Sequence, residues 1–133
     1  MPQAAESSAP RGQILIADDE PHIRRILATL LESASFGVDP QPDGTAAIAA
    51  LESDAPYDLI LLDIMMPGAS GLEVLSHLRG LEHRKSTPVV ILTGKGQDAD
   101  REQAFSLGAN DFLTKPFSPK KLLARINEIL DGS

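Results

Sequence analysis

Four short runs of apolar residues recur along the chain, and a segment with helical spacing follows each of them. The runs are Ile14–Ala17, Leu59–Leu62, Val89–Leu92 and Phe112–Leu113. Because the first three runs are apolar at every position, they predict strands that are covered on both faces of a sheet. Strands that alternate with helices in this way are typical of an α/β fold with a parallel sheet between two helical layers.

The segments between the runs predict five helices. They extend from Pro21 through Leu31, from about Gly44 to Ser53, from Ser70 to Gly80, from about Ala99 to Leu107, and from Ser118 through Leu130. Ser70 and Glu73 have the spacing of a capping box, and Ser118 followed by Pro119 is a typical helix start. In the last helix the spacing predicts five buried side chains, at Leu122, Leu123, Ile126, Ile129 and Leu130.

The segment Phe36–Pro42 carries the weakest strand signal. Val38 is its only β-branched apolar residue, and Pro40 and Pro42 cannot donate hydrogen bonds to a neighbouring strand. If this segment is a strand, it must therefore lie at the edge of the sheet. With it, the pattern predicts five strands and five helices.

The chain has 133 residues, of which 42% are hydrophobic and 23% charged, and this predicts one domain with a sizeable core. We expect residues 1–12 to be a flexible leader, residues 13–131 to form the domain, and residues 132–133 to be a short tail. The net charge of −7 disfavours direct contact with nucleic acid or with an anionic membrane surface. The absence of cysteine excludes thiolate chemistry and favours a cytoplasmic location, and no apolar run approaches the length of a membrane span.

Polar residues follow the predicted strands at the points where the strands end. Asp18 and Asp19 follow the first strand, Asp63 the third, Thr93 the fourth, and Lys115 the fifth. Since the carboxyl ends of parallel strands share one edge of the sheet, we expect these side chains to converge there.

Three carboxylates at one edge repel one another unless a cation neutralises them, and Mg²⁺ prefers oxygen ligands of this kind. A lysine and a threonine at the same edge fit a phosphoryl group that comes and goes. Asp63, alone at the end of a central strand, is the best nucleophile for forming an aspartyl phosphate. Asp18 and Asp19 would then lie on the metal side, with Thr93 and Lys115 on the phosphoryl side.

Four motifs in this order resemble the receiver domain of two-component response regulators, over nearly the whole chain from Gln13 to Leu130. The motifs are ILIADDEP, DLILLDIMMPGASGLEVL, VVILTGKG and GANDFLTKPF. The resemblance implies a three-layer, doubly wound, flavodoxin-like fold with strand order 2-1-3-4-5. It also implies that Asp63 is the phosphoacceptor, and that Asp18, Asp19, Asp63 and the backbone carbonyl of Met65 bind Mg²⁺.

The resemblance further implies a switch and a set of partners. Thr93 and Lys115 would bind phosphoryl oxygens, the Lys115–Pro116 peptide bond would be cis, and Phe112 would occupy the switch-aromatic position. The phosphoryl donor would be a phosphohistidine of a sensor histidine kinase or a histidine phosphotransfer protein, docking around the first helix and the loop at Pro116–Phe117. The fourth helix, fifth strand and fifth helix would form the face for a downstream effector protein or domain, or for a phosphorylation-dependent homodimer. The domain would catalyse only its own phosphorylation and dephosphorylation.

Other functions fit the residues less well. The principal alternative is a degenerate receiver that serves as a phosphorylation-independent interaction module, but such a domain would have lost Asp63, Thr93 or Lys115. Gly94–Lys95–Gly96 resembles part of a dinucleotide-binding fingerprint, but it follows the fourth strand and lacks the acidic ribose ligand about 20 residues later. A phosphohydrolase would place a second acid two residues after the nucleophile, where this chain has Met65. A flavin site would need aromatic side chains, and the chain has no tryptophan and one tyrosine.

Overall fold

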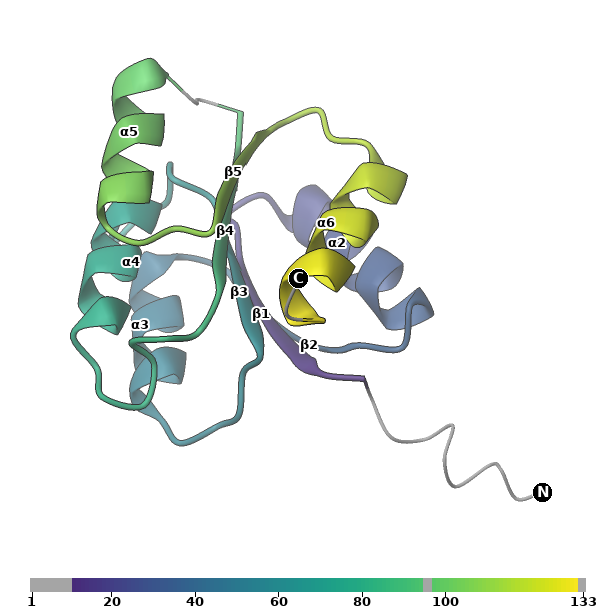
Figure 1. Ribbon diagram of the computed structural model, residues 1–133, viewed down its shortest axis with the longest axis horizontal. Helices are drawn as coiled ribbons and strands as arrows, with labels where there is room; N and C mark the ends of the chain where they lie inside the picture. Colours follow the sequence, from purple (N-terminus) through teal and green to yellow (C-terminus); the bar gives the residue numbers. More distant parts are fainter. Residues whose placement is uncertain (1–10, 95–96, 132–133) are drawn as a thin grey trace.

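The computed structural model describes residues 11–94 and 97–131, and five parallel strands form one sheet in the order β2-β1-β3-β4-β5 (Figure 1). The strands are β1 (Gln13–Ala17), β2 (Gly37–Gln41), β3 (Leu59–Leu62), β4 (Val89–Thr93) and β5 (Asp111–Thr114). The helices are α2 (Pro21–Ser33), α3 (Gly44–Glu52), α4 (Gly71–Arg79), α5 (Asp98–Ser106) and α6 (Pro119–Leu130). This confirms the predicted fold class and strand order. Most of the predicted leader, the two-residue tail, and Lys95–Gly96 lie outside the described residues.

The central strands are the parts of the chain that the apolar runs predicted most closely. Every residue of β3 and β4 is buried, and β3 has the predicted bounds Leu59–Leu62. β2 lies at the edge of the sheet, where it pairs only with β1 and places Pro40 opposite Ile16. The prediction of an edge strand is therefore confirmed, since a proline is tolerated where one side of the strand has no neighbour.

Alternate residues of the strands face two separate cores, one on each side of the sheet. Helices α3, α4 and α5 cover one face and α2 and α6 cover the other, as Figure 1 shows on either side of the sheet. In β1, for example, Leu15 packs in the core under α3 and α4, while Ile14 and Ile16 pack in the core under α2 and α6. Three helices thus cover one face, and two cover the other.

The predicted helix starts are confirmed by their hydrogen bonds. Ser70 Oγ accepts from the Glu73 amide while the Glu73 carboxylate accepts from the Ser70 amide, which is a complete capping box. Ser118 Oγ accepts from the Lys121 amide at the start of α6. These contacts satisfy amide groups that a helix leaves unpaired in its first turn.

The burial expected for α6 is only partly correct. Leu122 and Ile126 are fully buried, whereas Leu123, Ile129 and Leu130 are half-buried. In α2, Ile26 is exposed although its spacing matches that of the buried residues. The reason is that two helices do not fully cover this face: a shallow groove remains between α2 and α6, lined by His22, Arg25, Ile26, Thr29, Leu30, Ser33 and Pro119. Among the described helices, none is both long and apolar enough to cross a membrane.

Candidate functional site

Backbone pairing at the carboxyl ends of the strands brings the predicted site residues together. The Asp63 amide donates to the carbonyl of Ala17, so Asp63 lies beside the end of β1. The Lys115 amide donates to the carbonyl of Thr93 in the same way. Side chains that are up to 97 residues apart in the sequence therefore meet because parallel strands end at one edge of the sheet.

Asp18, Asp19 and Asp63 form an acidic cluster at this edge. Each offers a carboxylate oxygen, and these oxygens lie within 4.8 Å of one another. Asp18 and Asp63 are 2% and 6% exposed, whereas Asp19 faces solvent. Burial raises the pKa of the Asp18 carboxyl above its usual range, although hydrogen bonds from Lys115 and from the Glu20 amide act to lower it.

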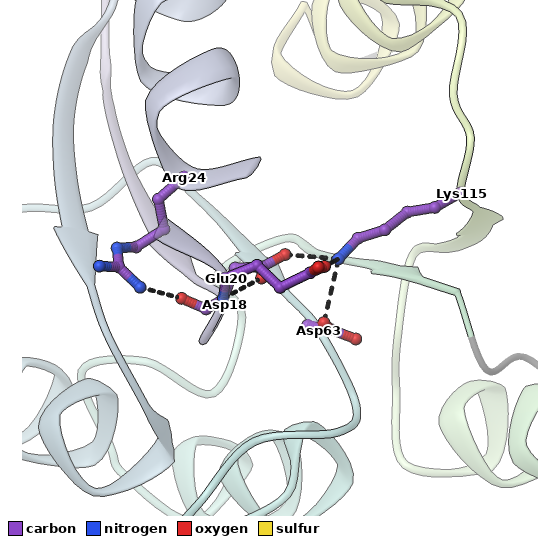
Figure 2. A network of polar contacts seen from close by, with 5 residues as sticks. All are labelled: Asp18, Glu20, Arg24, Asp63 and Lys115. Atoms are coloured by element: carbon purple, nitrogen blue, oxygen red, sulfur yellow. Dashed lines mark hydrogen bonds and ion pairs between the residues drawn. The ribbon is translucent and has the colours of Figure 1, made fainter. Parts of the chain in front are cut away.

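The Lys115 ammonium lies among three carboxylates and joins β5 to β1 and β3 (Figure 2). Its Nζ is 2.7 Å from Asp18 Oδ2, 3.1 Å from Asp63 Oδ2 and 3.4 Å from Glu20 Oε1. Burial acts to lower the pKa of Lys115, but the hydrogen bonds to Asp18 and Asp63 outweigh it and raise the pKa above its ordinary value. Lys115 is therefore charged at neutral pH. In this structure its ammonium group is paired with the carboxylates of Asp18 and Asp63.

One oxygen of Asp63 lacks a partner within the described part of the chain. Asp63 Oδ2 accepts from Lys115, but Oδ1 is buried and makes no hydrogen bond there. A buried carboxylate oxygen without a partner is costly, and it is the kind of atom that a cation or a newly bonded group satisfies. Together with the clustered carboxylates, it shows that the residues present fit a hard divalent cation such as Mg²⁺.

Thr93 and Gly94 lie on the β4 side of the cluster. The Thr93 side chain is fully buried at the end of β4. Among the described residues, a Cβ added at Gly94 would come within 4 Å of the Lys115 Cβ alone, at 3.9 Å, so there is open space beside Lys115 at this position. The structure thus brings Asp18, Asp19, Asp63, Thr93 and Lys115 to one edge, as predicted. Met65, two residues after Asp63, has an exposed side chain.

Phe112 lies on β5, three residues before Lys115, and its side chain is buried in the core under α4 and α5. The Arg101 guanidinium of α5 lies 5.9 Å from the centre of its ring and donates to the Phe112 carbonyl at 3.3 Å. The Lys115–Pro116 peptide bond that follows is cis, as the resemblance implied. The aromatic side chain is therefore packed into the core, on the strand that precedes Lys115.

Two residues that contact the cluster were not identified as site residues from the sequence. Glu20 contacts Lys115, and Arg24 Nη1 donates to the main-chain carbonyl of Asp18 at 2.7 Å (Figure 2). Glu20 is the residue directly before α2, where an acidic side chain is also explained by the helix dipole. Arg24 did carry a signal, because a cation in the first turns of a helix is unfavourable to the helix dipole and calls for another explanation.

Comparisons with known proteins agree with this geometry. A family model described as the response regulator receiver domain matches residues 14–127. The transcriptional regulatory protein ResD of Bacillus subtilis is 44% identical over 118 residues, which are 89% of this chain and 48% of that protein. The chain thus spans about half the length of this curated relative.

Two solved structures are similar over nearly the whole chain. A CheY-like receiver domain protein from Methanospirillum hungatei has a TM-score of 0.85 at 28% identity, covering 90% of this chain and 94% of that one. The receiver domain of the sensor histidine kinase PA1611 from Pseudomonas aeruginosa has a TM-score of 0.81 at 31% identity, covering 92% and 98%. That second structure holds a magnesium ion in its active-site cleft.

Proposed function

The chain belongs to the response regulator receiver family, a family of signalling domains in two-component systems, and from this we propose that Asp63 accepts a phosphoryl group from a phosphohistidine donor. The observation that carries the proposal is the state of Asp63 itself. Its carboxylate is buried, faces the Lys115 ammonium at 3.1 Å, and keeps one oxygen without a partner among the described residues.

Asp18, Asp19, Asp63 and the backbone carbonyl of Met65 are the groups that would hold Mg²⁺. When bound, the ion neutralises negative charge on the carboxylates and on the incoming phosphoryl oxygens, which lowers the barrier to their approach. The similar receiver domain from Pseudomonas aeruginosa, which holds magnesium in its active-site cleft, supports the choice of metal.

In the proposed reaction a carboxylate oxygen of Asp63 attacks phosphorus and forms a P–O bond. The P–N bond to the donor imidazole breaks, its electron pair stays on the imidazole nitrogen, and that nitrogen gains a proton from water. Lys115, already close to Asp63, moves from Asp18 and Asp63 to a phosphoryl oxygen. The Thr93 hydroxyl donates to a second one, so that both side chains stabilise charge on the adduct.

The adduct then shifts a conformational equilibrium. A phosphoryl group that is hydrogen-bonded by Thr93 in one state and not in the other favours that state by the difference in contacts. Movement of Thr93 would free space into which Phe112 turns, and this would reshape the face formed by α5, β5 and α6. That face would contact the downstream effector, an output domain of the same protein, or a second copy of the chain.

The proposal also includes the partners of the domain and its location. The donor, on a sensor histidine kinase or phosphotransfer protein, would dock around α2 and the Pro116–Phe117 loop. The curated relative is named a transcriptional regulatory protein, and its greater length leaves room for an output domain. A net charge of −7 disfavours nucleic-acid binding by the receiver itself. A cytoplasmic location, and catalysis limited to its own phosphorylation and dephosphorylation, belong to the same proposal.

A phosphorylation-independent interaction module is not favoured. A domain that had lost phosphoryl chemistry would have no reason to keep Asp63, Thr93 and Lys115 together. Here Lys115 is in direct contact with Asp63, and Thr93 ends the neighbouring strand.

The test is the intact mass of the protein after incubation with acetyl phosphate and Mg²⁺. We expect the wild type to gain one phosphoryl group, only when Mg²⁺ is present, and Asp63→Asn to gain none. Asp54→Asn, which alters an exposed carboxylate outside the cluster, is the matched control and should behave like the wild type. If the wild type gains no mass even after short incubation and acid quenching, the proposal is wrong.

A further inference from the structure

Asp18 is held by more contacts than a metal ligand alone would need. Its amide donates to the carbonyl of Gln41 at 3.2 Å, its Oδ1 accepts from the Glu20 amide at 2.9 Å, and its Oδ2 accepts from Lys115 at 2.7 Å. Its main-chain carbonyl accepts from Arg24 Nη1 at 2.7 Å. Every polar group of this buried residue therefore has a partner.

One of those contacts must change during function. Lys115 pairs with Asp18 and Asp63 in the structure, so a cation that binds these carboxylates competes with the ammonium. Once Lys115 withdraws, Asp18 is positioned by Gln41, by the Glu20 amide and by Arg24. Of these three, Arg24 is the one that supplies a side chain, and its contact is charge-assisted and therefore strong.

The Arg24 side chain makes its hydrogen bond outside its own helix, to Asp18. Arg24 lies four residues into α2, close to the positive end of the helix dipole, where a cation is destabilising. Its half-buried side chain turns back to the end of β1, as Figure 2 shows. The neighbouring Arg25 has the same charge but is exposed and lines the groove between α2 and α6.

We propose that Arg24 is a positioning residue for the magnesium site: by holding the Asp18 carbonyl, it keeps the Asp18 carboxylate in place for the metal when Lys115 moves away. This inference rests on the proposed function and adds a residue to it. Groups that support a metal ligand from behind often matter nearly as much as the ligand itself.

For the Mg²⁺ affinity of an Arg24 variant, the proposal predicts a change in the opposite direction to the one that electrostatics alone predicts. Arg24 is a cation close to a cation site, so removing its charge should tighten Mg²⁺ binding if charge alone matters. Loss of positioning should weaken Mg²⁺ binding instead. Arg25→Gln removes the same charge from the next residue without touching Asp18, and it measures the electrostatic contribution by itself.

The experiment is a titration of MgCl₂ into the unphosphorylated protein, followed by amide chemical shifts of the folded state. We expect Arg24→Gln to raise the Mg²⁺ Kd about tenfold, and Arg25→Gln to leave it unchanged or lower it. Arg24→Lys, which can still donate to the carbonyl, should lie between Arg24→Gln and the wild type. At saturating Mg²⁺ the rate of phosphorylation by acetyl phosphate should return close to the wild-type rate.

The outcomes are distinguishable. If Arg24→Gln and Arg25→Gln have the same Mg²⁺ Kd, Arg24 contributes only charge or helix anchoring and the inference is overturned. Because the shifts come from folded molecules, a loss of stability does not imitate weaker binding. If Arg24→Gln does not fold, Arg24→Met takes its place, because it keeps the apolar part of the side chain and has no donor for the Asp18 carbonyl. A Mg²⁺ Kd for that variant equal to that of Arg25→Gln overturns the inference. A wild type that shows no Mg²⁺-dependent shifts overturns the proposed metal site as well.

Discussion

Among single residues, the acidic cluster combines attraction between Lys115 and two carboxylates with repulsion among the carboxylates. Lys115 pairs with Asp18 and Asp63, while Asp19 adds a further carboxylate within 4.8 Å of them. Two like charges at about this separation repel by roughly 1 kcal/mol in water. The arrangement thus favours binding of a cation at the expense of the metal-free fold.

We predict that Asp19→Asn stabilises the metal-free protein, by up to about 1 kcal/mol, because it removes one repelling charge. The same substitution should reduce the additional stability that Mg²⁺ provides, because a ligand that binds only the folded state stabilises it less when its Kd is higher. Urea unfolding with and without MgCl₂ measures both effects. Asp54→Asn is the control, and equal behaviour of the two variants would contradict the prediction.

Tyr57 lies outside the acidic cluster, and its environment predicts how the stability of the fold depends on pH. Its hydroxyl donates to the Asp39 carboxylate, and the Arg84 guanidinium lies 4.8 Å from the centre of its ring. Burial, and then the hydrogen bond to Asp39, raise the pKa of Tyr57 above its ordinary value of about 10, against a smaller lowering by Arg84. A raised pKa in the folded state means that this stabilisation is complete below about pH 10 and is lost as the pH rises further.

We therefore expect the wild type to lose more free energy of unfolding between pH 8 and pH 10.5 than Tyr57→Phe does. Lysines and other groups titrate in both proteins, so the difference between the two isolates the tyrosine. Urea unfolding at the two pH values is the measurement, and parallel losses in both proteins would show that folding does not raise the pKa of Tyr57.

At the scale of elements, the start of α4 is packed directly against the end of β3. A Cβ added to Gly71 would lie 2.1 Å from the carbonyl oxygen of Asp63. The Gly71 amide donates to the carbonyl oxygen of Ile64 at 2.9 Å. Only a residue without a side chain allows this approach. The position of Asp63 therefore depends on a glycine eight residues later.

We predict that Gly71→Ala lowers the free energy of unfolding by about 1–3 kcal/mol, because one element must move. The displacement of Asp63 should also slow phosphorylation by acetyl phosphate. Gly80→Ala is the matched control, since a Cβ there would meet nothing closer than the His77 carbonyl oxygen, at 3.4 Å. A Gly71→Ala variant as stable and as reactive as Gly80→Ala would refute the close approach.

The elements themselves were predictable to different degrees, for physical reasons. β3 was predicted to the residue because an apolar run covered on both faces has one consistent interpretation. The edge position of β2 followed from Pro40 and Pro42. Burial on α2 and α6 was less accurate, because helical spacing identifies the inner face but not how much of that face the neighbouring elements cover. Ile26 has the right spacing and is still 37% exposed.

The sequence predicted which residues meet in the candidate site, but not which hydrogen bonds and ion pairs they make there. Strand ends determined that Asp18, Asp63 and Lys115 would meet, since that follows from topology. The partners of Lys115 did not follow, because a four-carbon side chain reaches many positions. The Arg24 contact was missed for a related reason: it ends on a main-chain carbonyl, which every residue has and which no motif marks.

At the scale of the whole molecule, the face formed by α5, β5 and α6 combines an exposed aromatic ring with charges of both signs. Phe105 is 40% exposed, with the Arg101 guanidinium 5.3 Å from the centre of its ring. Arg125 of α6 is paired with Asp111 of β5 at 2.6 Å. If phosphorylation reshapes this face as proposed, a surface of this composition would suit contact with a second copy of the chain.

We predict that the phosphorylated chain sediments as a dimer and that the unphosphorylated chain sediments as a monomer. Phe105→Ser should weaken the dimer at least about tenfold, since burial of a phenylalanine contributes roughly 2 kcal/mol. Sedimentation velocity with and without acetyl phosphate is the measurement. Ala49→Ser, on the exposed side of α3, is a control on another face. Equal sedimentation with and without phosphate would contradict the prediction.

The uneven helical covering of the sheet has a consequence for how such a domain diversifies. The groove between α2 and α6 is lined largely by residues that neither core depends on, among them His22, Arg25, Thr29 and Ser33. If the phosphoryl donor docks around α2 as proposed, substitutions there would alter which donor is bound, while Asp63, Lys115 and the buried strands would be unchanged. After a gene is duplicated, two copies could therefore acquire separate donors through changes in this part of α2, and both would keep the proposed chemistry and the same fold.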